Sequence, residues 1–332
     1  MNTQSKSTSF QTILDSLLDE RHEFPRRYLQ QFSDISELEL KSLLDVWPRV
    51  KPSRKLALLE EFEALAASDS LVSFEDLARA LLNDSDSSVR GRAIRLLGEC
   101  SDTRLVPTYL DILNNDPDPQ TRAEAATILN IFVDLGELEE IPEEIHRQVE
   151  DALLAIANGN DSSNVRRRAL ESLGYSSRSE VAALIESAFH REDPAWKTSA
   201  LLAMGCSADE RWEDEILVSL VDEDQNIKEA AVKAAGQLGL KSAGPILLKM
   251  LAEEEDDEIT TATIWSLSQI GGEDARTYIE SLLDQSEDDD QIEFLEEALE
   301  NLAFTEDLDR FHLMSVDPEA ELTDLDEDDE DE

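Results

Sequence analysis

The sequence predicts an all-α protein, a right-handed α-solenoid (superhelix) of about seven to eight antiparallel helix pairs. Three observations predict this fold class. A pattern of apolar, basic and small residues recurs at a nearly constant interval, and apolar stretches with helical period separate its copies. The 332 residues also include only 11 Gly and 10 Pro, which is too few for a turn-rich β structure.

The recurring pattern starts at an apolar anchor and continues with a basic residue, a small residue four positions on, and Gly or Asn nine positions on. The clearest copies read SSVRGRAIRLLG, SNVRRRALESLG and QNIKEAAVKAAG, with anchors at Val89, Val165 and Ile227. Looser copies have their anchors at Thr121, Trp196, Ile259 and Phe294. The anchors lie about 32 residues apart, which fits one helix pair with two short turns. An insertion around 133–147 lengthens one interval.

Each position of the pattern predicts a local structure. Ala at the fourth position, replaced once by Thr263, predicts a close approach of neighbouring second helices. Gly or Asn at the ninth position predicts a left-handed cap at the helix end. Aspartates in the preceding turn can cap the N-terminus of the second helix. These aspartates are Asp84, Asp86, Asp116, Asp118, Asp222 and Asp224.

The basic residue directly after the anchor has an expected partner. We expect it to form an ion pair with turn aspartates of its own or the adjacent repeat, because stacked repeats bring such charges together. The residues at this position are Arg90, Arg122, Arg166, Lys197 and Lys228.

The extent of the pattern divides the chain into three parts. Residues 1–34 are expected to form a capping helix and linker, and residues 35–304 the repeat array. Residues 305–332 are expected to form an acidic disordered tail, since the segment is too acidic to bury an apolar core.

Composition excludes several classes of partner and site. The net charge of −48 repels nucleic acid and anionic lipid surfaces and attracts basic partners. The cysteines, Cys100 and Cys206, form no CxxC pair, so we expect neither a disulfide framework nor a zinc site. No stretch has the length and apolarity of a signal peptide or a membrane helix. These features predict a cytoplasmic protein without a membrane partner.

The pattern D-x-x-x-x-V-R-x-x-A-x-x-x-L-G at Asp84–Gly98, with conservative changes at Asp222–Gly236, resembles the HEAT-like repeats of the phycobilisome-lyase type. The resemblance implies stacked helix pairs whose second helices line a concave surface. Proteins with such repeats include chromophore lyases, a di-iron hydroxylase, DNA glycosylase-like proteins and scaffolds, so the resemblance leaves function open.

The residues of the sequence do not favour a catalytic or metal-binding site. Di-iron hydroxylases of this kind use several His-Glu pairs, whereas here only His22 is followed by Glu. The other histidines are interpreted as solvated surface residues. We therefore expect no catalytic residue, no cofactor and no metal site, and we expect that the chain is not an enzyme.

The resulting hypothesis is a scaffold or adaptor that binds protein partners on the concave face of the second helices. The candidate partner-binding residues are Arg92, Arg95, Arg167, Arg168, Lys233 and Trp265. Trp265 is the candidate hot spot, because exposed tryptophans are enriched in such roles. Trp196 is expected in the core, and Trp212 is expected to be half exposed.

The first alternative function is an enzyme or enzyme subunit of the lyase or hydroxylase kind. The second is nucleic-acid binding through a local arginine patch, which the net charge opposes.

Overall fold

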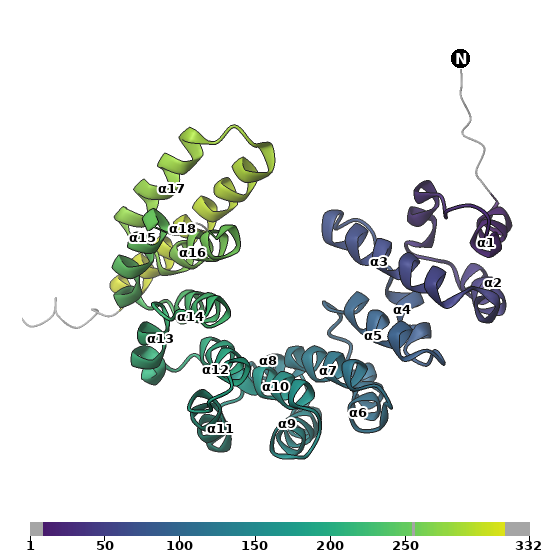
Figure 1. The fold of residues 1–332 in the computed structure, drawn as a ribbon, viewed down its shortest axis with the longest axis horizontal. Helices are drawn as coiled ribbons and strands as arrows, with labels where there is room; N and C mark the ends of the chain where they lie inside the picture. The colour runs from purple at the N-terminus through teal and green to yellow at the C-terminus, as the bar shows by residue number, and fades with distance from the viewer. Residues whose placement is uncertain (1–8, 254–255, 316–332) are drawn as a thin grey trace, which may run out of the picture. The chain divides into compact units, whose positions relative to one another are not determined.

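The structure is a computed structural model that describes residues 9–253 and 256–315. Every regular element in these residues is an α-helix or a short 3₁₀ helix, which confirms the predicted all-α repeat fold. The chain divides into two compact units, Met1–Ser176 (unit 1) and Ser177–Glu332 (unit 2). Each unit contains four helix pairs in its described residues, and Figure 1 shows their order along the chain.

Unit 1 starts with α1 (Phe10–Leu18) and the 3₁₀ helix η1 (Arg26–Phe32). Its first helices are α2 (Glu37–Val46), α4 (Glu75–Leu81), α6 (Val106–Asn115) and α9 (Glu143–Asn158). Its second helices are α3 (Pro52–Ser68), α5 (Ser87–Leu96), α7 (Pro119–Ile128) and α10 (Ser163–Ser172). Consecutive second helices pack against one another and form one row. The predicted insertion contains an additional helix, α8 (Asn130–Glu137), which packs on α9.

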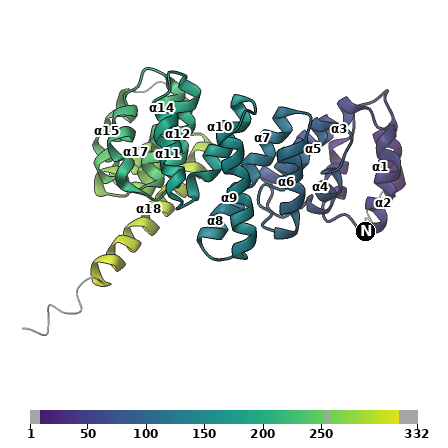
Figure 2. The same cartoon turned by 90° about the horizontal axis from the view of Figure 1, so that it is seen from below.

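Unit 2 repeats this arrangement without an additional helix. Its first helices are α11 (Ser179–Phe189), α13 (Glu213–Ser219), α15 (Gly244–Glu253) and α17 (Glu273–Gln285). Its second helices are α12 (Pro194–Cys206), α14 (Gln225–Gln237), α16 (Asp257–Ile270) and α18 (Asp289–Ser315). Figure 2 shows that the end of α18 extends past the other helices of this unit.

Short 3₁₀ helices join several of these elements. They are η2 (Trp47–Arg49), η3 (Thr103–Leu105), η4 (Leu173–Tyr175), η5 (Glu210–Trp212) and η6 (Lys241–Ala243). Residues 305–315, which the sequence analysis assigned to the tail, are helical as the end of α18. The rest of the predicted disordered tail lies outside the described residues. The division into cap, array and tail therefore stays a prediction.

The aspartates before the second helices have two different roles. The second aspartate of each D-x-D turn caps the helix, as Asp118 does by accepting a hydrogen bond from the Thr121 N–H. The first aspartate accepts the N–H of the second one instead, as Asp116 does from Asp118 at 3.0 Å. The same division holds in the turns at 84–86 and 222–224. The capping prediction is therefore confirmed for only one aspartate of each pair.

In four turns an aspartate also binds the basic residue of the preceding repeat. The N···O distances are 2.6 Å for Arg90–Asp116, 2.6 Å for Arg122–Asp161, 2.7 Å for Lys197–Asp222 and 3.2 Å for Lys55–Asp84. We call these four pairs the inter-repeat ladder. The ladder confirms the predicted pairing of Arg90, Arg122 and Lys197 and shows that the partner belongs to the next repeat. Lys55 is a member that the sequence pattern did not assign.

Three carboxylates of the ladder, Asp84, Asp161 and Asp222, are held in their charged form. The hydrogen bond from Arg122 lowers the pKa of Asp161, and the hydrogen bond from Lys197 lowers the pKa of Asp222. Burial raises the pKa of Asp84, but hydrogen bonds from the Asp86 N–H and the Trp47 indole outweigh burial, so the pKa lies below its ordinary value. Each of these carboxylates therefore stabilises the folded state in its ionised form.

Small residues set the close approach of the second helices. The Ala or Thr at the fourth position is fully buried in every described copy, as predicted.

The glycine at the ninth position is not the left-handed cap that we expected. Instead, a Cβ at Gly236 would lie only 2.7 Å from the Ser266 Cα, and one at Gly205 would lie 2.8 Å from the Ala234 Cα. The left-handed position comes three residues later and is occupied by Ala208, Gly239 and Gly271.

Candidate functional site

The arginines Arg92 and Arg95 lie together on α5, and both are paired with carboxylates of neighbouring second helices. Arg92 contacts Glu63 of α3 at 2.8 Å, and Arg95 contacts Glu63 at 3.3 Å and Glu124 of α7 at 2.7 Å. The positive charge of these arginines is therefore balanced locally. This balance weakens the nucleic-acid alternative, which needs a net basic patch.

Arg167 and Arg168 lie on α10. Arg168 pairs with Glu171 on the same helix at 2.6 Å. Arg167 is half buried and donates a hydrogen bond to the Asn164 side-chain oxygen at 3.5 Å. Helix α7 packs between α5 and α10, which separates these arginines from Arg92 and Arg95.

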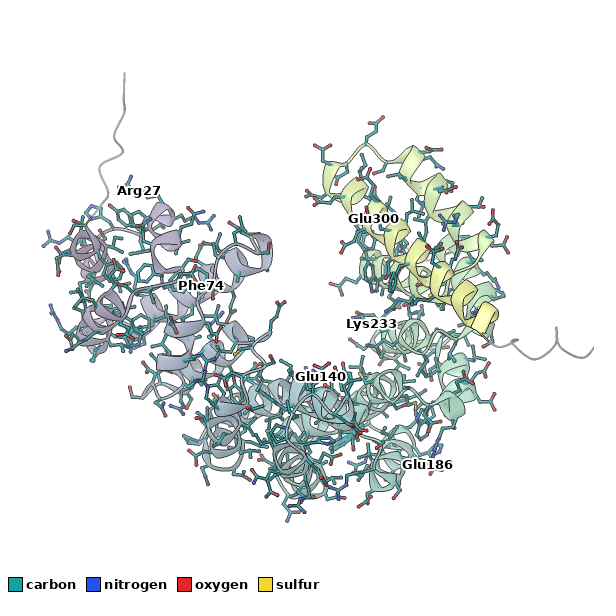
Figure 3. All side chains as sticks on the ribbon, turned by 180° about the vertical axis from the view of Figure 1, so that it is seen from behind. Arg27, Phe74, Glu140, Glu186, Lys233 and Glu300 are labelled. Atoms are coloured by element: carbon teal, nitrogen blue, oxygen red, sulfur yellow. The ribbon has the colours of Figure 1, made fainter. Side chains whose placement is uncertain are left out.

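Lys233 and Trp265 meet in a groove of unit 2, which we call the Trp265 groove. The groove has a volume of about 630 Å³ and lies on the face formed by α12, α14, α16 and α18. Figure 3 shows Lys233 and Glu300 on this face, whereas Glu186 lies on the face of the first helices. The apolar lining consists of Leu202, Ala262, Trp265 and Phe294.

The aromatic rings in the Trp265 groove lie side by side. The centroids of Trp265 and Phe294 are 6.5 Å apart, and the Trp265 side chain is half buried. Trp196 is buried, as predicted, whereas Trp212 is buried although we expected it to be half exposed. Trp265 is therefore the tryptophan of unit 2 that presents an accessible aromatic surface.

The polar lining of the Trp265 groove is acidic. Asp257 and Glu258 lie in the first turn of α16, and Glu229 lies on α14. Lys233 is the one basic residue of the lining, and its Nζ atom is 2.5 Å from the Glu229 carboxylate. The groove therefore offers an apolar floor and uncompensated negative charge, which suits a ligand that is basic and partly apolar.

Unit 1 contains a larger cavity of about 950 Å³ beneath α1. Of the four basic residues that line it, Arg26, Lys51 and Arg54 are engaged within the unit. Arg54 donates hydrogen bonds to the carbonyl oxygens of Asp19 and His22, at 3.0 and 2.6 Å, and Lys51 pairs with Glu20 at 2.6 Å. We interpret these contacts as fixing the chain after α1 to α3.

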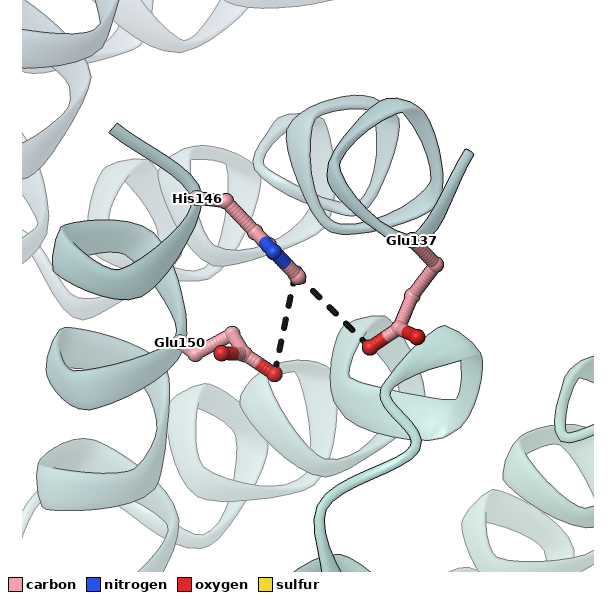
Figure 4. Close-up of side chains that lie close together, drawn as sticks. All are labelled: Glu137, His146 and Glu150. Atoms are coloured by element: carbon pink, nitrogen blue, oxygen red, sulfur yellow. Dashed lines mark ion pairs between the residues drawn. The ribbon is translucent and has the colours of Figure 1, made fainter. Parts of the chain in front are cut away.

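Unit 1 also contains a polar cluster that the sequence pattern did not predict. Glu137 of α8 and His146 and Glu150 of α9 point toward one another, as Figure 4 shows. The Nε2 atom of His146 is 3.8 Å from a Glu137 oxygen and 3.7 Å from a Glu150 oxygen. The interpretation of His146 as a solvated surface residue was wrong, because its side chain is only 15% exposed. The His–x₃–Glu spacing, which places both side chains on one face of a helix, was the available signal.

Cys100 lies in a polar cluster with Glu75, Arg79 and Asp102. Its thiol donates a hydrogen bond to Glu75 at 3.4 Å. Burial raises the pKa of Cys100, with a further contribution from the Glu75 carboxylate, although the Asp102 backbone and Arg79 act in the opposite direction. The thiol is therefore protonated at neutral pH and is a poor nucleophile.

The repeats match a known family. The family model of HEAT repeats matches residues 74–143 and 214–300, so the chain contains HEAT repeats. The matched regions fall in both units. A search of curated proteins finds no matching sequence.

Solved structures with similar folds include the complex of CpcE and CpcF of phycocyanin lyase from Nostoc sp. PCC7120. The identity is 15%, the TM-score is 0.53, and the alignment spans 86% of this chain and 97% of that one. Human deoxyhypusine hydroxylase aligns over 89% of this chain and 96% of its own, with 16% identity and a TM-score of 0.35. The first likeness shows a shared fold, and the second is too distant to bear on function.

The likeness to the lyase corrects one prediction. We expected that the chain is not an enzyme, and this expectation is contradicted, because a phycocyanin lyase shares the fold over nearly its whole length. The repeat fold is therefore compatible with catalysis as well as with scaffolding. A search of the described helices finds no membrane-spanning candidate. The cytoplasmic location stays a prediction.

Proposed function

We propose that this chain, which contains HEAT repeats, binds a basic segment of a partner protein in the Trp265 groove. The observation that carries the proposal is the pairing of an accessible aromatic floor with acidic walls. Trp265 and Phe294 provide the floor, and Asp257 and Glu258 provide charge that no lysine or arginine of the lining balances. Extended helical surfaces of repeat proteins are suited to binding such segments.

Lysine and arginine side chains fit this groove in two ways. Their aliphatic stems can pack on Trp265, and a cation over an indole ring contributes about 0.5–2 kcal/mol. Their charged ends can then reach Asp257 or Glu258. Gln237 and Gln269 also line the groove and can hydrogen-bond the backbone of an extended segment.

The charge of the whole chain supports the same class of partner. A net charge of −48 attracts basic proteins over long distances and speeds their association at low ionic strength. Arg92 and Arg95 on α5, and Arg167 and Arg168 on α10, stay predicted contact residues for a partner. They have weaker support, because the carboxylates beside Arg92, Arg95 and Arg168 already balance their charge.

The test is a selection of random peptides on the full chain, followed by binding isotherms for the peptides that emerge. We expect lysine and arginine to be enriched next to aliphatic or aromatic residues. Trp265→Ala should weaken binding about tenfold or more, as expected for a hot spot. Glu258→Lys should weaken it as well, with a larger loss at low salt.

The matched control for Glu258→Lys is Glu186→Lys, which makes the same charge change on an exposed residue of α11. It should leave peptide binding within about twofold, because it lies on the face of the first helices and acts only through screened charge. Thermal unfolding of each variant verifies that the fold is retained. Equal loss in both charge variants, or full binding by Trp265→Ala, would overturn the proposal.

A further inference from the structure

The Glu137–His146–Glu150 cluster is built by two helices that the insertion brings together. Glu137 is the last residue of α8, and His146 lies in the first turns of α9. The connecting turn places Glu139 in the left-handed region with φ of 59°, and the Glu140 N–H donates to the Leu135 carbonyl at 2.8 Å. This closed turn directs the Glu137 side chain back toward α9.

The imidazole of His146 lies in a space that a glycine leaves open. A Cβ at Gly136 would lie 2.2 Å from the His146 ring, so any larger residue at this position would displace the ring. The His146 Nε2 atom is fully buried and has no hydrogen-bond partner in the described part of the chain. A buried ring nitrogen without a partner costs free energy, and a bound ligand would remove that cost.

The two carboxylates face this nitrogen at distances that are too long for a hydrogen bond but suitable for a shared ion. The Nε2–oxygen distances of 3.7 and 3.8 Å compare with about 3.4 Å between two ligands of a tetrahedral ion at bond lengths of about 2.1 Å. All three ligand atoms lie within 4.8 Å of one another. A small adjustment of the side chains would bring them into one coordination sphere.

We propose that Glu137, His146 and Glu150 bind a divalent transition-metal ion of the Zn²⁺ class. One imidazole nitrogen and two carboxylate oxygens are ligands that Zn²⁺ accepts, and the two negative charges balance the ion. Three protein ligands leave a fourth position open to water or another ligand. The imidazole favours Zn²⁺ over Mg²⁺ and Ca²⁺, which prefer oxygen ligands alone.

The surroundings of Glu150 fit a ligand that is held in place. Glu150 is 5% exposed, and the Ser176 hydroxyl donates a hydrogen bond to its Oε1 atom. In known metal sites, hydrogen bonds of this kind orient the side chains that coordinate the ion. The site lies in unit 1, so the inference is independent of the peptide groove in unit 2.

The test is a calorimetric titration of the full chain with Zn²⁺ after removal of metals by a chelator. Excess Mg²⁺ is present throughout, so that it occupies the many exposed carboxylates. We expect one Zn²⁺ per chain that Mg²⁺ does not displace, and a visible absorption band when Co²⁺ replaces Zn²⁺. The one-to-one site should be lost in His146→Gln. It should remain in His22→Gln, the matched control, which removes an exposed histidine paired with Asp19.

Two further variants keep the test decisive if His146→Gln unfolds. Glu137→Gln changes a side chain that is partly exposed and should also lose the site. Gly136→Ala leaves all three ligands in the sequence and should lose the site by displacing the imidazole. Zn²⁺ should raise the thermal midpoint of the wild type but of none of these variants. A wild type without a Zn²⁺ site that resists Mg²⁺, or a site that survives in any of the three variants, would overturn the proposal.

Discussion

At the residue scale, the position twelve residues after the anchors Trp196, Ile227 and Ile259 has a backbone conformation that favours glycine. Gly239 and Gly271 occupy it with φ of 61° and 77°, and Ala208 occupies it with φ of 49°. The Ala208 side chain meets a steric cost in this region that glycine avoids. The structure therefore identifies Ala208 as a strained residue in an otherwise regular turn.

Replacing this alanine should stabilise the protein. Ala208→Gly should raise the free energy of unfolding by about 1 kcal/mol, because it removes the left-handed strain. The control is Ala303→Gly, at an exposed position inside α18, which should lower it by about 1 kcal/mol. Urea unfolding of both variants measures the two effects. A destabilised Ala208→Gly variant would show that the position is not strained.

At the element scale, the ninth position of the pattern determines how closely second helices approach. Gly236→Ala should lower the free energy of unfolding by about 1–3 kcal/mol, because the new Cβ would overlap with α16 at Ser266. Gly244→Ala is the matched control, since a Cβ there meets no atom within 4 Å. It should change stability by less than about 0.5 kcal/mol or increase it slightly. Equal losses in both variants would contradict a packing role for Gly236.

The inter-repeat ladder is the second element-scale feature. Asp116→Ala should lower the free energy of unfolding by about 3 kcal/mol, because it leaves the half-buried Arg90 without its carboxylate. The control Glu144→Ala removes the partner of Arg147 in an exposed pair on α9 and should cost less than about 1 kcal/mol. Chemical denaturation compares the two variants. A loss at Asp116 no larger than at Glu144 would show that the ladder adds nothing to repeat stacking.

At the scale of the whole molecule, two effects give stability a maximum in mildly acidic solution. Between pH 7 and about pH 5, partial protonation reduces the repulsion within a chain of net charge −48, so stability should rise. Asp84, Asp161 and Asp222 have folded pKa values below the ordinary value of 3.8. A lowered folded pKa contributes stability above the unfolded pKa, and this contribution is lost as pH falls through the folded pKa. Stability should therefore fall below about pH 4.

Urea unfolding across this pH range measures the profile. Added salt at pH 7 should raise stability by screening the repulsion, and Asp222→Asn should flatten the acid limb. A profile that declines steadily from pH 7 to pH 5 would contradict a dominant role for the repulsion between carboxylates.

The sequence predicted the parts of the fold that depend on spacing along one helix. The anchor, the buried Ala and the basic residue after the anchor lie at fixed intervals, so periodicity was sufficient to find them. Periodicity did not predict contacts between two different elements. The role of Gly236 depends on the distance between α14 and α16, and the pairing of Arg92 with Glu63 joins residues of two repeats. Neither distance is encoded in the spacing along a single helix.

The candidate sites show the same limit. Trp265 was identified from its offset on the helix, but its neighbour Phe294 and the acidic walls became visible only with the packing of α16 and α18. His146 was misread because its burial depends on Gly136, ten residues earlier on another helix. Function was the least predictable feature, since a fold shared with a phycocyanin lyase complex does not by itself determine activity or partner.

The most direct test of the central claim is hydrogen exchange of the full chain with and without a selected basic peptide. The proposal predicts added protection in α14, α16 and α18, which line the Trp265 groove, and no such protection in Trp265→Ala at the same peptide concentration. Protection confined to unit 1, or to the first helices of unit 2, would contradict the assignment of the groove as the binding site.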